Sequence, residues 1–194
     1  MNPEQLKNAF AAFDAYNAQD PNQETYAGIS HPKELLYAQR MTDRLAAYAP
    51  EVPEYLQLAA RGQHIGRWEI PRKSYPMDRK GYLKWRNELK FHHAKIAEGI
   101  LKDCGYDANT IEIVKFLLLK RELQQNPDTQ LLEDVICLVF IEYYLEDFAA
   151  QHEEEKVIDI IRKTMKKMTP RAIQYTAELP MSERVKELIG EAAK

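Results

Sequence analysis

The chain lacks the features that mark secreted, membrane-spanning and disulfide-bonded proteins. Its first residues show no basic start followed by an apolar run, and no stretch approaches about 18 uninterrupted apolar residues. Its only two cysteines, Cys104 and Cys137, lie inside amphipathic segments and have no CxxC spacing. We therefore expect free thiols that pack as small buried hydrophobic groups. Together these absences predict a soluble protein of the cytoplasm that does not bind membranes.

An excess of positive charge is also missing. Lys and Arg total 27 against 30 Asp and Glu, which gives a net charge of -3 at pH 7. Such a balance provides no general attraction to polyanions. We therefore expect no general nucleic-acid binding, so that any anionic ligand must be held by a local basic patch. The oligomeric state is left open.

Strand alternation, internal repeats and low-complexity tracts are absent too, whereas apolar residues recur at helical spacing along the chain. The sequence predicts an all-α fold, a single compact multi-helix domain over residues 1–194, with Ser30 or His31 capping its second helix. Helices are expected near residues 3–17, 32–49, 53–62, 82–103, 110–118, 131–148, 152–167, 170–178 and 182–193, with an irregular loop over 67–80.

Two histidines stand out against these helices. His64, in LAARGQHIGRW, lies where the third predicted helix meets the loop, so that its ring can face a cleft or cap the helix end. His92 precedes Ile96 by four residues, which places both on one helix face. Because Ile96 is expected to be buried, we expect His92 to be buried and its neighbour His93 to be more exposed.

Asp134 is a carboxylate in the seam of LLEDVICLVFIEYY, the most apolar helix predicted. An unpaired charge buried there would cost several kcal/mol, so a partner is required. One solution is a divalent metal ion (Zn, Mn, Fe or Mg) bound by His64, His92 and Asp134. The alternative is an ion pair with an arginine of another helix, such as Arg40 or Arg61.

Basic and aromatic residues crowd into residues 67–86, although the chain as a whole is slightly acidic. Guanidinium groups match the oxygens of phosphate and carboxylate in paired geometry, and aromatic faces can stack on bases or sugars. The segment therefore predicts a site for an anionic, nucleotide-like ligand, unless its two tryptophans only pack. The candidate substrate-binding residues are Arg67, Trp68, Arg72, Lys73, Tyr75, Arg79, Trp85 and Arg86.

Four segments resemble the HD-domain superfamily of metal-dependent phosphohydrolases, which are all-helical: LLYAQRMTDRL, LAARGQHIG, FHHAKIAEGILKDCGY and LEDVICLVF, within residues 33–145. The resemblance implies an HD-like core there, followed by C-terminal helices over 152–193. It places His64, His92 and Asp134 at ligand positions. However, Tyr37 stands at the first-histidine position, Ile65 at the aspartate of the His-Asp pair, and Lys120 at a second accessory histidine.

Over most of its length the chain resembles more closely an uncharacterised domain-of-unknown-function family, with the patterns YAxRMT, QHxxRWxxPRxxYP, GYLxWR and LEDVxCLVF.

These observations predict a metal-dependent hydrolase that acts on a small phosphorylated or anionic substrate. A metal-bound water would be the nucleophile, and Arg67 and Arg72 would hold the anion. Glu133 or Tyr37 would carry a proton, although Glu133 can also be read as a surface charge. The alternative is an HD-like protein without catalysis that binds a nucleotide, RNA or protein partner through residues 67–86. The departures at Tyr37 and Ile65 favour that alternative.

Overall fold

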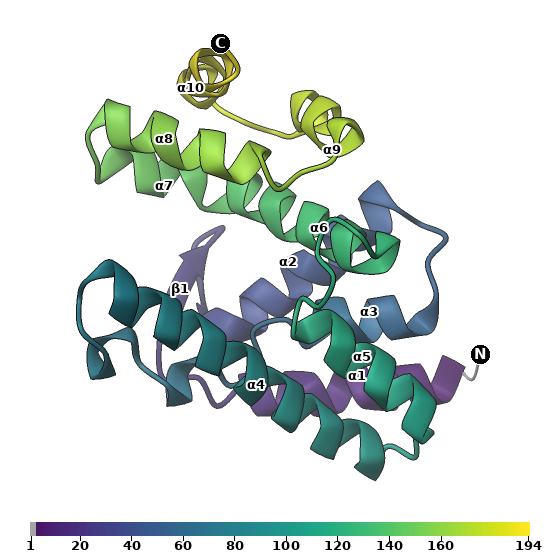
Figure 1. The fold of residues 1–194 in the computed structure, drawn as a ribbon. Coiled ribbons are helices and arrows are strands. Elements are labelled where there is room, and N and C mark those ends of the chain that lie inside the picture. The colour runs from purple at the N-terminus through teal and green to yellow at the C-terminus, as the bar shows by residue number, and fades with distance from the viewer. Residues whose placement is uncertain (1–2) are drawn as a thin grey trace. The chain divides into compact units, whose positions relative to one another are not determined.

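The computed structural model describes residues 3–194, and nearly all of its regular structure is helical (Figure 1). The all-α prediction is therefore confirmed. The chain divides into two compact units, Met1–Arg121 and Glu122–Lys194. That the whole chain acts as a single domain stays a prediction. None of the described helices combines the length and the apolar character that crossing a bilayer requires.

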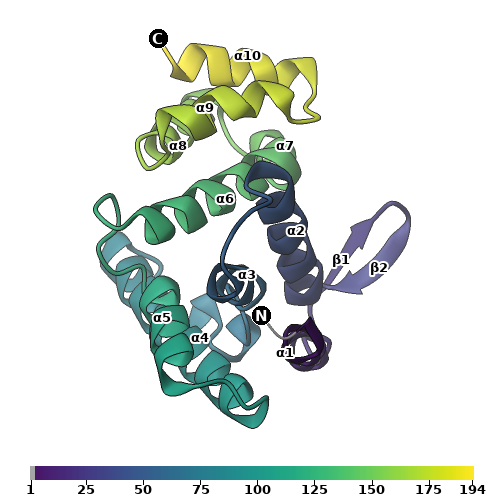
Figure 2. The same ribbon diagram turned by 90° about the vertical axis from the view of Figure 1, so that its right-hand side faces the viewer.

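The first unit is built around its third helix. Helix α3 contacts α1, α2 and α5 (Figure 2). Leu58, Ala59 and Ala60 of α3 are fully buried, and the two alanines allow neighbouring helices to approach closely. The helices of this unit are α1 (Pro3–Asn17), α2 (Lys33–Tyr48), α3 (Glu54–Arg61), α4 (Arg79–Asp103) and α5 (Ala108–Leu118).

A β-hairpin precedes α2, which the sequence did not predict. Strands β1 (Gln23–Tyr26) and β2 (Ile29–Pro32) pair antiparallel, and the turn residues Ala27 and Gly28 both have positive φ angles, of 50° and 79°. Such angles are typical of a tight hairpin turn. Because neither strand has a buried face, there is no apolar alternation to detect.

The start of α2 also differs from the prediction, because the second strand of the hairpin contains the residues that were expected to cap the helix. Ser30 and His31 lie in β2 and do not cap the helix, which begins at Lys33 without a side-chain cap from the preceding residue. Instead, the backbone N–H of Glu34 donates to Asp20 Oδ2 at 3.0 Å. A residue from before the hairpin thus satisfies one of the free donors at the start of α2.

The segment between α3 and α4 is irregular, as predicted, apart from two short 3-10 helices, η1 (Arg67–Glu69) and η2 (Arg72–Ser74). Gly66 lies within this segment, directly before η1, and its φ is +68°. A Cβ on this glycine would lie 2.4 Å from Ile96 Cδ1 and 3.2 Å from His92 Nε2. Gly66 therefore allows the chain to turn while in close contact with α4.

The second unit contains α6 (Pro127–Tyr143), α7 (Leu145–Ala150), α8 (Glu154–Met165), α9 (Pro170–Tyr175) and α10 (Glu183–Ala192). The helix predicted over 131–148 is in fact two, because the backbone leaves the helical conformation at Tyr144 (φ -124°). Asn126 caps α6 by accepting from the N–H groups of Asp128 and Thr129. Helices α7, α8 and α10 pack on one another.

Candidate functional site

His64 lies just beyond α3 and contacts side chains from two other parts of the first unit. Its ring stacks on Tyr37 of α2, with the centroids 4.0 Å apart and the planes 14° from parallel. Arg67 Nη1 donates to His64 Nε2 at 3.0 Å, and His64 Nδ1 lies 3.5 Å from Glu34 Oε2. The same Arg67 nitrogen lies 3.4 Å from His64 Nδ1, so the guanidinium group is close to both ring nitrogens.

The surroundings of His64 keep its imidazole uncharged. Burial lowers the pKa of His64 well below its usual value, and the positive charges of Arg67, Arg86 and Lys120 lower it further, together with His93. Even so, 21% of the His64 side chain and 27% of the Arg67 side chain are exposed. The position therefore combines a neutral ring, nearby cationic groups and access from solvent.

Glu34 is the site residue that the sequence analysis missed. Only 8% of its side chain is exposed, and burial raises its pKa to about 7, while the charge of Arg67 acts in the opposite direction. The two groups are close, with Arg67 Nε 3.7 Å from Glu34 Oε1. A carboxyl group with this pKa exchanges its proton near neutral pH, as a general acid or base requires.

The predicted exposure of the two adjacent histidines was wrong. His93 is the buried one, 3% exposed, and its Nδ1–H donates to the carbonyl oxygen of Ile65 at 2.6 Å. His92 is partly exposed, and its Nε2 lies 3.1 Å from Gly66 O and 3.2 Å from Glu69 Oε2. Burial lowers the pKa of His93 to about 3.

The exposure of the two histidines was predicted wrongly because α4 buries a different face from the one expected. Its buried row is Trp85, Leu89, His93, Ala97 and Leu101, which repeat every four residues. The residues taken from the sequence as markers of the buried face, Ile96, Gly99 and Ile100, are instead partly or fully exposed. The face of α4 that was expected to be buried is therefore rotated about the helix axis from the face that is buried. As a result, His93 is buried where His92 was expected to be.

The three predicted metal ligands are not brought together in the first unit. The His64 and His92 rings flank His93, with centroids 5.8 Å and 6.2 Å from its ring. Asp134 belongs to the second unit, where its oxygens accept from Thr169 N at 2.9 Å, Thr169 Oγ1 at 2.6 Å and Gln130 Nε2 at 3.0 Å. Asp134 thus holds the residue that caps α9.

These contacts do not fit a shared metal ion as they stand. Residues 3–194 contain no group of three or more His, Cys, Asp or Glu side chains arranged to hold one. In addition, the Nε2 lone pair of His64 faces a guanidinium group, whose positive charge opposes a cation at that point. The metal prediction therefore stays a prediction, and no chemical step is derived from it.

The predicted proton carriers lie in different units. Tyr37 is buried against His64 in the first unit, whereas Glu133 lies on α6 in the second. Glu133 is 3% exposed, and Lys167 Nζ lies 3.8 Å from its Oε1. Its interpretation as a surface charge was therefore wrong. Tyr37 thus contacts a residue of the His64 site.

The basic and aromatic residues of the loop play different parts. Arg67 reaches His64, and its Cζ also lies 4.9 Å from the centroid of Trp85. Trp85 is buried, and its Nε1–H donates to Ile70 O at 2.8 Å, so it joins the loop to α4. Arg72 stiffens the loop by donating to the carbonyl oxygens of Tyr75 and Asp78.

The other predicted loop residues differ in exposure and in their contacts. Trp68 is partly exposed, and its ring lies 5.9 Å from that of Tyr16. Lys73 and Arg79 are exposed. Arg86 donates to Tyr82 Oη at 3.1 Å, and its charge contributes to the lowered pKa of His64.

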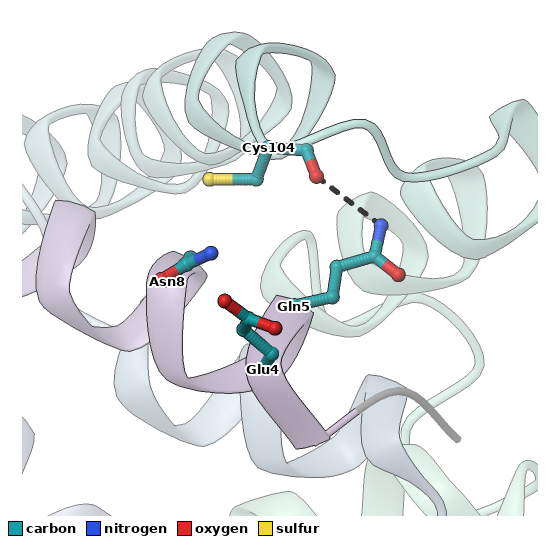
Figure 3. Close-up of a pocket in the computed structure, with 4 residues that line it drawn as sticks. All are labelled: Glu4, Gln5, Asn8 and Cys104. Carbon is teal, nitrogen blue, oxygen red and sulfur yellow. Dashed lines mark hydrogen bonds between the residues drawn. The ribbon is translucent and has the colours of Figure 1, made fainter.

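A separate pocket of about 310 Å³ lies beside the start of α1 and the end of α4 (Figure 3). It is lined by Glu4, Gln5, Asn8 and Cys104, and Gln5 Nε2 donates to the carbonyl oxygen of Cys104 at 3.2 Å. Cys104 is partly exposed, contrary to expectation, while Cys137 is buried; both are free thiols. Burial raises the pKa of the Cys104 thiol, which keeps it protonated and weakly nucleophilic.

Comparison with known proteins identifies a family but no function. A family model described as a domain of unknown function (DUF4202) matches residues 7–189, which is most of the chain. No curated protein and no solved structure matches the chain.

Proposed function

The chain belongs to this DUF4202 family, and we propose that its first unit binds a small phosphorylated or otherwise anionic ligand at His64 and Arg67, beside the proton-carrying Glu34. The observation that carries the proposal is the neutral, partly exposed His64 ring surrounded by the charges of Arg67, Arg86 and Lys120. Such a position attracts an anion, and the guanidinium of Arg67 offers it several hydrogen-bond donors in one plane.

The protonation state of Glu34 supports the same ligand class. Below pH 7 its carboxyl group is mostly neutral, so the charge of Arg67 is not compensated by it. The buried arginines of the first unit, Arg40 and Arg61, already form ion pairs with Glu24 and Asp14. An anion that replaces water beside Arg67 would therefore supply the missing negative charge.

The catalytic form of the proposal is a hydrolase that acts on the phosphorylated ligand, as the resemblance to HD-domain phosphohydrolases implies. Water would attack the phosphorus atom as the bond to the leaving oxygen breaks. Glu34, whose pKa lies near neutrality, would give its proton to the leaving oxygen and take one from the attacking water, which restores its protonated form. Arg67 would stabilise the negative charge that develops on the transferred group. The stacking of Tyr37 on His64 would fix the orientation of the ring.

Calorimetric titration of the whole protein with inorganic phosphate, pyrophosphate and adenosine monophosphate tests the binding proposal. Arg67→Gln should weaken binding by about tenfold or more, which corresponds to the loss of a charge-assisted hydrogen bond. Arg184→Gln is the matched control, since Arg184 is exposed on α10. Equal binding by both variants, or no binding by the wild type, would refute the proposal.

A metal-dependent hydrolase is the second candidate. The observation that favours it is the neutral imidazole of His64, since only an unprotonated ring nitrogen can bind a metal ion. Elemental analysis of the purified wild type, His64→Ala and Asp134→Ala tests this candidate. Stoichiometric metal in the wild type that both substitutions remove would support it, while a metal-free wild type, with both variants folded, would count against it.

A further inference from the structure

Positive charge is concentrated in one segment of the first unit. Residues 67–95, which comprise the loop after α3 and most of α4, contain nine of the chain's 27 Lys and Arg but only three of its 30 Asp and Glu. The net charge of -3 therefore conceals a basic segment within an otherwise acidic chain. Such a segment attracts polyanions even when the whole protein does not.

The three acids of this segment lie together. Glu69, Asp78 and Glu88 all line a pocket of about 700 Å³, which also contains Lys80 and Lys84. Carboxylates that accept hydrogen bonds keep their charge, so the pocket carries three negative charges against two positive ones. The pocket is therefore not a site for an anion, and the other cations of the segment lie outside it.

A row of cations runs along the other side of α4. Arg79, Tyr82, Arg86 and Lys90 follow one another at intervals of three, four and four residues, which places them on one side of the helix. That side lies roughly 150° around the helix axis from the α4 residues that line the pocket. We call these four residues the α4 basic row.

The cations of the α4 basic row are not neutralised by neighbouring acids. Within the part of the chain that the structure describes, Arg79, Arg86 and Lys90 form no ion pair, and Arg86 instead donates to Tyr82 Oη at 3.1 Å. The one acid in this part of α4, Glu88, lines the pocket. Because all four residues of the row are exposed or partly exposed, a ligand can reach them from solvent.

Tyr82 adds an aromatic ring between the cations. It is 42% exposed, and the Cζ atoms of Arg72 and Arg86 each lie 5.9 Å from its ring centroid. These contacts hold the ring in place, while part of it stays open to solvent. An open aromatic ring among cations is typical of surfaces that bind single-stranded nucleic acids, because every base has a face that can stack on it.

The length of the row favours a strand over a small ligand. Arg79 and Lys90 are 11 residues apart, which is about 16 Å along the helix axis. Successive phosphates of a stacked strand lie about 3.4 Å apart along its axis, so the row spans several nucleotides. A mononucleotide or a single phosphate group would contact only part of it.

We infer that the α4 basic row binds single-stranded nucleic acid. The phosphates of the strand would lie along the three cations of the row, and one base would stack on Tyr82. This ring favours a strand over an anionic lipid surface or inorganic polyphosphate, since neither of these has a base to stack on it. The inference needs no ligand at Arg67, so it stands even if the proposed anion site fails.

Fluorescence anisotropy of the whole protein with labelled oligouridylate and oligothymidylate of about ten nucleotides tests the inference. The pair Arg79→Gln and Lys90→Gln should weaken binding by about tenfold or more. It should also reduce the magnitude of the slope of log K against log salt by about 1.4, because each cation paired with a single strand contributes about 0.7. Circular dichroism will check that the variants keep their helicity.

Substitutions at Tyr82 test the stacking. Tyr82→Leu should weaken oligonucleotide binding by about fivefold or more but leave the binding of inorganic polyphosphate unchanged. Tyr82→Phe is the matched control, since it keeps the ring and loses only the hydroxyl group that accepts from Arg86. It should bind the oligonucleotides as tightly as the wild type does.

The pair Lys156→Gln and Arg184→Gln is the control for charge, because it removes one lysine and one arginine at exposed positions of α8 and α10. The inference is overturned if the wild type binds neither oligonucleotide, if this pair weakens binding as much as the α4 pair, or if Tyr82→Leu binds normally. Binding through the row to phosphatidylserine vesicles or polyphosphate alone would also overturn it. Binding of only one oligonucleotide would support it and identify the strand as RNA or DNA.

Discussion

Burial sets the charge of three titratable side chains that lie close together in the first unit. It raises the pKa of Glu34 to about 7, lowers that of His93 to about 3, and lowers that of His64 well below its usual value. All three are therefore largely uncharged at slightly acidic pH, although Arg67 beside them keeps its charge. Each shift links stability or binding to pH in a direction that can be measured.

The stability that depends on His93 is expected to fall in acid. The unfolded chain binds a proton at this histidine near pH 6.5, whereas the folded chain does so only near pH 3, so stability is lost as pH falls through that window. Between about pH 7.5 and pH 5, the free energy of unfolding of the wild type should fall by about 2 kcal/mol more than that of His93→Asn. Urea unfolding at both values measures this, and a constant difference would contradict the burial of a neutral ring.

Anion binding at His64 and Arg67 is expected to weaken as Glu34 ionises. Sulfate is a suitable probe, because its charge stays constant over the range. The wild-type affinity for sulfate should fall by about tenfold between about pH 6 and pH 8, since the ionised Glu34 competes for Arg67. Glu34→Gln should bind sulfate equally at both values. A fall of the same size in this variant would assign the titration to another group.

The sequence identified His64 and Arg67 because a helix end followed by a basic loop is visible in the pattern of residues. It could not identify Glu34, since an acid in the first turn of a helix is common and stabilising on its own. Its burial arises from contacts with residues that are distant in the sequence. The exchange of His92 and His93 shows how an error of one residue in helix phase changes a site.

At the scale of elements, close packing between the segment after α3 and helix α4 positions the site. Gly66 lies at this contact with a positive φ, and its backbone carbonyl accepts from His92. The adjacent carbonyl, that of Ile65, accepts from His93. Two consecutive peptide groups therefore fix two histidines of α4.

Gly66→Ala should destabilise the first unit by roughly 2 kcal/mol or more, because the new Cβ adds left-handed strain and a steric clash with Ile96. Gly99→Ala is the matched control. It lies inside α4 with open space around it, so the better helix propensity of alanine should stabilise the protein by about 0.5–1 kcal/mol. Chemical denaturation compares the two, and a neutral Gly66→Ala would show that the contact can relax.

Most helices were predictable because they have a continuous amphipathic pattern and a recognisable end. The hairpin was not, since its eight residues are mostly exposed and carry no periodic signal. The break at Tyr144 was also hidden, because the apolar pattern continues from α6 into α7 without a glycine or proline. Backbone geometry, and not composition, divides these two helices.

At the scale of the whole molecule, the connector between the two units holds an unusual run of backbone conformations. Lys120, Glu122 and Gln124 all have positive φ angles, of 54°, 52° and 73°. Each costs a non-glycine residue about 1 kcal/mol relative to ordinary backbone. The sequence does not predict this division into two units, because no stretch rich in Gly, Pro or Ser separates them.

Glycine at one of these positions should therefore stabilise the protein. Gln124→Gly is expected to raise the free energy of unfolding by up to about 1 kcal/mol, since the strain at an exposed residue is removed. Gln125→Gly, at the exposed neighbour with ordinary φ, should lower it by a similar amount. Thermal unfolding of both variants checks the prediction. If both variants lost stability, the left-handed conformation at Gln124 would be in doubt.

The location of the two tryptophans has a spectroscopic consequence. Trp68 and Trp85 are the only tryptophans of the chain, and both belong to the first unit. Selectively excited tryptophan fluorescence therefore reports on that unit alone, whereas the far-ultraviolet dichroism of the helices reports on both. Because the guanidinium of Arg67 lies over the Trp85 ring, an anion that draws Arg67 away should change the emission without any added dye.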